Sequence, residues 1–454
     1  MKNNKTIRRI LVVLAGIVAV TAIVYAAFSV QRYFLSSTED LKTVGGKTMP
    51  VRILWQERFE SDVIAKLSED FTKETGIPVI VEQVSIPRWQ EISYQELASG
   101  FPRFDLLVGD SQWNGYAVEN GYYEDLTSFF DEHKILGTFS ESSTRGYGEY
   151  PEDSEKYYSV PLNANTNVYA YRTDWFADPV EQAAFKEQYG RELSVPRTYE
   201  ELRDIAKFFY RPEENRYGIV FPVSSSYDVV TMVFGSMLFG YGGSWGNRVT
   251  CVADGHINNN GAVIALELYR ELYQYTPPGM SNSLYAQAWN RFFEGDVALG
   301  MNFITNLDNN PIATSTGYFS GLFGPASRDA QLVGQGVSLV QGARNRDGAL
   351  KFLEWWIRYE TQQAFAEGNG LTTFRRVTTS QSFRDLNPYN EAYAVSIEHV
   401  RDFWNTPRYA ELLDISQRHF YNYLTSANAA SARETLEMIL SEWRPILAHE
   451  CNQQ

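Results

Sequence analysis

Apolar and polar positions follow two alternating patterns over residues 51–108. Short apolar runs bounded by polar or turn residues predict buried strands, and longer segments with apolar residues every three or four positions predict amphipathic helices between them. Strands that alternate with helices are typical of a parallel sheet with helical crossovers. The expected elements are strands at 51–55, 78–84 and 104–108, with helices at 60–74 and 88–98.

The remainder of the chain continues this mixture of strands and helices, which predicts an α/β fold. Thr198 and Glu201 have the spacing of a capping box, which marks the start of a helix. The last segment, 361–454, has a helical pattern throughout. The further expected elements are strands at 217–222, 297–303, 318–323 and 336–340, and helices at 174–189, after Pro196, and at 227–239, 260–273, 286–293 and 346–359.

The tyrosine-rich stretch 157–176 departs from both patterns. It reads as a strand in two parts, with Asn163, Asn165 and Asn167 between them. Three amide side chains suit the middle of a core strand poorly, because buried polar groups need hydrogen-bond partners. We therefore expect this stretch to leave one domain, cross an exposed gap and enter a second domain. A chain of 454 residues also exceeds one ordinary core and suggests two domains.

The N-terminus carries a basic segment, 1–9, followed by an uncharged apolar run at 10–28. This charge bias places the N-terminus in the cytoplasm and everything after the run outside it, with 29–49 as a polar linker. The run has the features of a cleavable secretory signal ending near Ala26, and it is also long enough to remain as a membrane anchor. No cysteine lies near it, which excludes a lipid-modified N-terminal cysteine.

The composition narrows the classes of partner and chemistry. The net charge of −15 disfavours nucleic acids and anionic membrane surfaces as partners. Cys251 and Cys451 are either a disulfide or two separate thiols, and two cysteines are too few for a zinc cluster. The sequence lacks zinc-protease, nucleophile-elbow, phosphate-loop and Cys-x-x-Cys motifs. We expect no enzymatic activity, metal or cofactor, although Glu57 and Asp110 could form a glycosidase pair.

Residues suited to binding a sugar or polyol lie in the predicted loops. Sugar hydroxyls need planar polar partners, and a sugar ring can stack on an aromatic side chain. Each candidate also has a structural explanation: Trp55 could belong to the core, Asp110 and Ser111 could cap a helix, and the asparagines could bond to backbone. Trp113 is the best candidate for stacking. The candidate ligand contacts are Trp55, Gln56, Asp110, Ser111, Gln112, Trp113, Asn163, Asn165, Tyr227, Trp245 and Gln335.

A series of short motifs resembles the extracellular solute-binding proteins of ABC transporters, specifically the sugar-binding group that includes maltose-binding protein. No single motif is specific for this family, but the order and spacing of the motifs over 300 residues are specific when taken together. The motifs are VPL at 160–162, VYAYRTDWF at 168–176, PRTYEEL at 196–202, YGG at 241–243 with Asn247, FFEGDVALGM at 292–301, FGP at 323–325, GQG at 334–336, GALKFL at 348–353 and TQQ at 361–363.

The resemblance implies the two-lobed periplasmic-binding-protein (Venus-flytrap) fold with a ligand cleft between the lobes. Lobe one would take 50–165 and 318–360, and lobe two 166–317 and 361–454. Asn302 joins the candidate contacts through the resemblance alone. The implied function is hinge closure on a small neutral solute, a sugar or polyol, which is delivered to transmembrane permease subunits by a monomer.

Two other functions remain open. One is a membrane-tethered ligand sensor of the same fold. Only its partner would distinguish a sensor from a transport protein, because a sensor would bind a signalling protein instead of a permease. The other is a carbohydrate-active enzyme whose turnover would be lost in the Asp110→Asn variant. Peptides, polyamines and organic acids also remain open as ligands.

Overall fold

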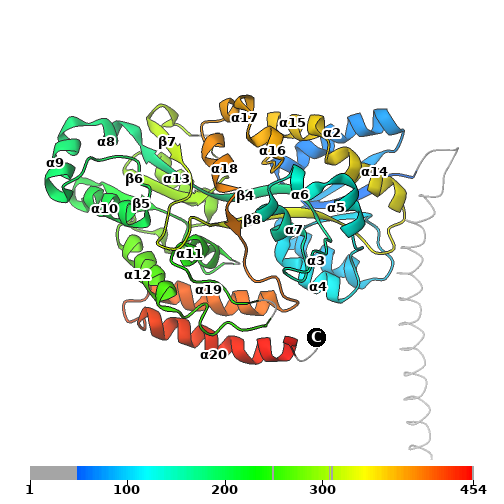
Figure 1. The fold of residues 1–454 in the computed structure, drawn as a ribbon. Helices are drawn as coiled ribbons and strands as arrows, with labels where there is room; N and C mark the ends of the chain where they lie inside the picture. The colour runs from blue at the N-terminus through cyan, green and yellow to red at the C-terminus, as the bar shows by residue number, and fades with distance from the viewer. Residues whose placement is uncertain (1–48, 227, 248–249, 306, 308–309, 452–454) are drawn as a thin grey trace, which may run out of the picture.

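The computed structural model describes residues 49–451 except 227, 248–249, 306 and 308–309. Two α/β halves lie side by side and are joined through one nine-stranded sheet (Figure 1). The strand order is β2-β1-β3-β8-β4-β6-β5, with β7 paired to β4 and β9 paired to β8. The expected cytoplasmic segment and the apolar run 10–28 lie outside the described residues. Within the described part of the chain, no helix has the length and apolar content needed to span a membrane.

The first half begins with the predicted alternation of strands and helices. The strands β1, β2 and β3 pair in parallel, and α2 buries Ile64 and Phe71 before it ends at Gly76 in the left-handed conformation that glycine favours. The elements are β1 (Val51–Gln56), α2 (Phe59–Thr75), β2 (Val79–Val84), α3 (Ile86–Ala98), β3 (Leu106–Asp110), α4 (Asn114–Glu119), α5 (Thr127–His133), α6 (Ile135–Thr138) and α7 (Glu141–Gly148).

The second half is built around β6, which pairs in parallel with β5 and in antiparallel with β4. The predicted capping residue Thr198 accepts a hydrogen bond from the Glu201 amide at the start of α10, as expected. The helix α11 is buried on every side because all its residues are apolar or small. The elements are β4 (Val160–Arg172), α8 (Thr173–Ala177), α9 (Pro179–Tyr189), α10 (Tyr199–Phe209), β5 (Tyr217–Val220), α11 (Val229–Gly240), α12 (Asn260–Gln274), α13 (Tyr285–Phe293), β6 (Val297–Phe303) and β7 (Thr316–Phe319).

The last third of the chain returns to the first half and then to the second. The strand β8 lies between β3 and β4, α15 packs on α2, and α19 and α20 pack against α11 and α12 (Figure 1). Cys251 is disulfide-bonded, and the side chain of Cys451 lies outside the described residues. The elements are β8 (Ala330–Leu339), α14 (Arg346–Trp356), α15 (Tyr359–Glu367), α16 (Arg375–Thr378), α17 (Gln381–Leu386), α18 (Asn390–Ser396), β9 (Val400–Arg401), α19 (Tyr409–Thr425) and α20 (Ala432–Cys451).

The strand β4 joins the two halves without the exposed gap that the sequence predicted. Its first part pairs with β8 and its second part with β6 and β7. Asn163, Asn165 and Asn167 are all buried. They suit a buried strand because each has a partner: Leu371 amide, Ile304 backbone and Ser236 hydroxyl respectively. The expectation of an exposed crossing is therefore wrong.

The packing of two segments bears on the expected division of the chain. Tyr318 and Phe319 belong to β7, which pairs with the second part of β4, although the sequence placed them with the first half. Conversely, α15 packs on α2 of the first half, although 361–367 was placed with the second. The pattern of apolar positions could not place these segments, because it records that a residue is buried and not which core buries it.

Candidate functional site

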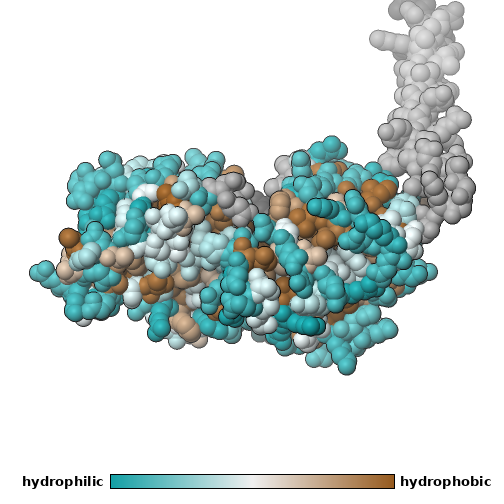
Figure 2. Space-filling model, turned by 90° about the horizontal axis from the view of Figure 1, so that it is seen from above, coloured by the Kyte–Doolittle hydropathy of each residue, from teal (hydrophilic) through white to brown (hydrophobic). Residues whose placement is uncertain are grey.

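A cavity of about 810 Å³ lies between the two halves. Figure 2 shows the two masses joined at a narrower waist. The first half lines the cavity with the segments that follow β1 and β3 and with the middle of β8. The second half lines it with the residue before α11, the start of α13 and the segment after β6. The cavity thus lies at the carboxyl ends of β1 and β3, where ligands of parallel sheets bind. Its charged lining residues are Glu57, Arg58, Glu60, Asp110 and Asp228.

A chain of hydrogen bonds crosses the first-half wall of the cavity. Arg58 donates from Nε and Nη2 to the two carboxylate oxygens of Glu60, both at 2.6 Å, and from Nη1 to Oε1 of Gln335 at 2.9 Å. Gln335 then donates from Nε2 to Oδ1 of Asp110 at 2.9 Å. Because the guanidinium fixes Oε1 of Gln335, its amide nitrogen must face Asp110. The segments that carry Arg58, Asp110 and Gln335 are far apart in the sequence, and these hydrogen bonds hold them in a fixed orientation relative to one another.

The two halves meet at Gln112 and Asp228. Gln112 is 5% exposed, and its Nε2 lies 4.0 Å from the sulfur of Met232 on α11. Its Oε1 has no hydrogen-bond partner among the described residues. Asp228 lies one helical turn before Met232 and accepts a hydrogen bond from the Tyr285 hydroxyl at 2.8 Å. Gln112 of the first half thus contacts α11 of the second half one turn beyond Asp228, and both residues line the cavity.

The carboxyl group of Asp228 has an unusual affinity for protons. Burial raises its pKa to about 7; the charges of Asp110 and Asp402 act in the same direction and the Tyr285 hydroxyl acts against them. Between pH 4 and pH 7 the folded chain therefore keeps a proton that the unfolded chain releases. The free energy of unfolding from this group accordingly falls as the pH rises through that window.

Replacing Asp228 with asparagine should remove this pH-dependent loss of stability, because the amide keeps an acceptor for Tyr285 and has no charge to bury. We expect the ligand-free Asp228→Asn variant to unfold about 3 °C above the parent protein at pH 8 and at nearly the same temperature at pH 4.5. Thermal unfolding followed by circular dichroism measures both. Asp131, exposed on α5 and outside the cavity wall, provides the matched control Asp131→Asn. An equal shift at both pH values would contradict the assignment.

Aromatic side chains line the cavity, with different degrees of exposure. Phe59, at the start of α2, is 55% exposed. Trp113 is buried against Trp89, with ring centroids 4.4 Å apart, and Trp89 donates to the backbone oxygen of Val108. Trp113 thus packs mainly on protein, whereas Phe59 offers the more accessible aromatic surface.

The structure brings seven of the predicted contacts to the cavity and places four others away from it. Tyr227 lies outside the described residues, and no lining position is occupied by the other four. The lining residues are Gln56, Asp110, Ser111, Gln112, Trp113, Asn165 and Gln335; those away from the cavity are Trp55, Asn163, Trp245 and Asn302.

The four residues away from the cavity are held by structural contacts. Trp55 is fully buried because β1 lies between β2 and β3. Asn163 bonds to the Leu371 amide and lies 3.4 Å from Glu60. Trp245 packs against Phe403 and Phe420 from the C-terminal segment, and Asn302 donates to the Tyr285 backbone oxygen.

Several lining residues were missed by the sequence reasoning. Arg58, Phe59 and Glu60 directly follow the predicted contact Gln56, and this adjacency was the available signal. Asp228, by contrast, was expected with Tyr227 in a loop suited to sugar binding, and it does line the cavity. Trp89 and Tyr285 gave no signal, since both read as ordinary residues of amphipathic helices.

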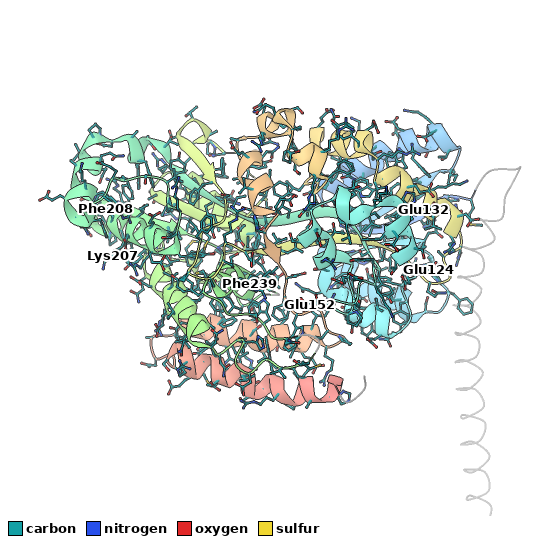
Figure 3. All side chains as sticks on the ribbon, viewed as in Figure 1. Glu124, Glu132, Glu152, Lys207, Phe208 and Phe239 are labelled. Atoms are coloured by element: carbon teal, nitrogen blue, oxygen red, sulfur yellow. The ribbon has the colours of Figure 1, made fainter. Side chains whose placement is uncertain are left out.

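A second, smaller cavity of about 200 Å³ also has walls from both halves. Phe239 from α11 and Glu152 from the loop after α7 line it, and Figure 3 labels both near the middle of the molecule. Asp402 lines this cavity and accepts a hydrogen bond from Ser111, which lines the larger one. Among the described residues, no group of three His, Cys, Asp or Glu side chains could hold a metal ion.

Comparison with known proteins gives one family and many similar folds. The model of the bacterial extracellular solute-binding protein family matches residues 57–363. A maltotriose-binding protein from Pyrococcus abyssi is 23% identical over 136 residues, which cover 30% of this chain and only a quarter of that protein. The sugar-binding protein MalE from Xanthomonas citri has a TM-score of 0.72 and 18% identity, covering 88% of this chain and 98% of that one. A solute-binding protein from Agrobacterium radiobacter in complex with ribitol has a TM-score of 0.70 and 21% identity, covering 89% and 100%.

Proposed function

Because the chain belongs to the bacterial extracellular solute-binding protein family, we propose that it captures a sugar or polyol outside the cytoplasm and delivers it to an ABC transporter permease. The two-lobed α/β fold expected from the sequence is confirmed by the solved structures that match nearly the whole chain. The observation that supports the proposal best is the cavity itself, whose wall comes from both lobes. The Agrobacterium radiobacter protein with this fold was solved with ribitol.

The proposed mechanism is hinge closure across β4. A ligand that touches Arg58 and Gln335 of the first lobe and Asp228 and Tyr285 of the second makes its full set of contacts only when the lobes are closed. Such a ligand favours the closed form by its difference in affinity for the two forms. The closed form would then dock on the permease, and ATP would be hydrolysed by a separate subunit.

The lobe boundaries, the membrane anchor and the oligomeric state are further parts of the proposal. We assign β1–β3, α2–α7, β8, α14 and α15 to the first lobe, and α8–α13, β5–β7, α19 and α20 to the second, with β4 crossing between them. Residues 10–28 would export the chain or hold it at the membrane. The chain would act as a monomer, because each copy has a complete cavity.

A ligand screen by thermal unfolding tests the proposed function. We expect a sugar or polyol, and no amino acid, to raise the melting temperature of the full chain in mild detergent, since a ligand that binds only the native state adds about 2.7 kcal/mol at one hundred times its dissociation constant. Isothermal titration calorimetry then measures the affinity. Hydrolysis of a glycoside by the same preparation, abolished in Asp110→Asn, would contradict a purely binding role.

A further inference from the structure

The cavity is large for a single sugar or polyol. Its volume of about 810 Å³ lies near the upper end of the range, roughly 300–1,000 Å³, of clefts that hold drug-sized molecules. A pentitol, a hexitol or one hexose is smaller than such molecules and would leave much of this space to water. The proposed function, on which the following inference rests, does not fix the length of the ligand.

The cavity extends from one face of the sheet to the other. Because β1 lies between β2 and β3, the crossovers through α2 and α3 run in opposite directions along the sheet. Right-handed crossovers then place α2 and α3 on opposite faces, and Figure 1 shows α2 and α15 on one side of β8 and α3 on the other. Trp89 and Gln90 of α3 line the cavity, and so do Asn369 and Leu371, which follow α15. One continuous cavity therefore connects the two helical layers of the first lobe across the carboxyl ends of β1 and β3.

This span exceeds what one sugar ring can reach. Packed layers of secondary structure lie about 10 Å apart. A cavity with walls from the layers on both faces of a sheet is therefore longer than one such spacing, whereas a single ring is shorter than it. A single ring can contact one end of the cavity, and only a chain of linked rings can contact both ends at once.

Each end of the cavity carries groups suited to a sugar unit. At the α3 end, Gln90 is half-buried and follows Trp89 directly. At the other end, half-buried Asn369 accepts a hydrogen bond at Oδ1 from Nδ2 of Asn387 at 3.0 Å. The Nδ2 group of Asn369 has no partner among the described residues, so both of its N–H groups can donate to a sugar hydroxyl. The hydrogen bonds that join Arg58 and Gln335 lie on the wall that follows β1 and β8.

We propose that the ligand is a linear oligosaccharide of at least three sugar units, which lies across the carboxyl ends of β1 and β3. One end unit lies against Trp89 and Gln90, the middle of the chain meets the wall of Arg58 and Gln335, and the other end unit accepts a hydrogen bond from Asn369. The sequence suggested a small solute. It could not reveal a long one, because Gln90 and Asn369 are far apart in the chain and share a cavity only through the topology of the sheet.

Ligand series that differ only in length test this inference. We would titrate the full chain in mild detergent with α-1,4-linked and β-1,4-linked glucose oligomers and β-1,4-linked mannose oligomers of one to four units, and with ribitol and sorbitol. We expect the affinity in the series that binds to rise at least about tenfold with each unit up to the third, because each added unit reaches further protein groups. Isothermal titration calorimetry measures each dissociation constant.

A substitution at Asn369 tests where the chain ends. Asn369→Asp keeps the acceptor for Asn387 and removes both donors, so we expect it to weaken binding of the trimer about tenfold and binding of the dimer by a smaller factor. Asn428→Asp makes the same chemical change at an exposed position outside the cavity and should leave the affinities within about twofold of the parent protein.

The outcomes separate this inference from the function on which it rests. If ribitol, sorbitol or a single sugar binds as tightly as the best trimer, the extended ligand is wrong and the sugar-binding or polyol-binding function stands. If Asn369→Asp weakens the dimer and the trimer by the same factor, the placement of the end unit at Asn369 is wrong. If no sugar or polyol of any length binds while an amino acid or peptide does, the proposed function itself fails.

Discussion

Replacing Arg58 with methionine is expected to lower the affinity for the bound sugar or polyol at least about 100-fold, which corresponds to about 2.7 kcal/mol. The guanidinium compensates Glu60, whose side chain is only 12% exposed, and fixes the amide of Gln335. Without it, Glu60 becomes a largely buried carboxylate with no cation, which destabilises the folded wall of the cavity by up to about 3–5 kcal/mol and leaves the wall less well ordered for a ligand. Gln335 is also free to rotate away from Asp110. Isothermal titration calorimetry with the ligand found by screening measures the change.

Two further variants show whether the loss of affinity comes from the unpaired charge of Glu60 and whether it is specific to the cavity. The double variant Arg58→Met with Glu60→Gln removes both charges and should recover part of the lost affinity, which a double-mutant cycle quantifies. Arg358→Met removes a half-exposed arginine whose partner is Glu74, outside the cavity, and should leave the affinity within about twofold. Unchanged binding by Arg58→Met would show that the hydrogen-bond chain does not organise the site.

The part of the site at strand ends could be predicted because it follows from topology. The strands β1 and β3 are adjacent and parallel, so their carboxyl ends lie together, and Gln56 and Asp110 reach the same cavity. The elements with strong apolar periods, such as β6 at Val297–Phe303, were also located by pattern alone. These inferences need only neighbours in the sequence and the geometry of a parallel sheet.

The asparagines of β4 show where such reasoning ends. The sequence marks Asn165 as an anomaly in a strand, which predicts exposure or function. The structure satisfies this side chain through the backbone of Ile304, 139 residues later: Asn165 donates from Nδ2 at 2.8 Å and accepts at Oδ1 at 3.1 Å. No local pattern reveals a partner at that separation. Trp245 is a similar case, since Phe403 and Phe420 cover it.

The contact between β8 and β4 leads to the second large prediction. Gly334 lines the cavity beside Gln335 and has a φ of +108°, a conformation that side chains rarely adopt. A Cβ atom there would lie 2.3 Å from the backbone oxygen of Asn163 and 3.1 Å from the amide of Asn165. Those atoms belong to the part of β4 that pairs with β8, and β4 is held further along, from Asn167, by its pairing with β6. Gly334→Ala should therefore destabilise the protein by more than about 3 kcal/mol and weaken ligand binding.

A comparison with Gly342 separates the steric clash expected in Gly334→Ala from the backbone strain. Its φ of +79° is also unfavourable for alanine, but a Cβ atom would meet nothing within 4 Å. Gly342→Ala should then cost only the backbone strain, about 1–2 kcal/mol. Chemical denaturation of the two variants compares the losses directly. A larger loss of stability for Gly334→Ala would show that the close approach of β8 to β4 causes the additional destabilisation. Equal losses would mean that β4 can move away from the added Cβ atom. The cavity wall beside Gln335 would then be more deformable than the sheet pairing implies.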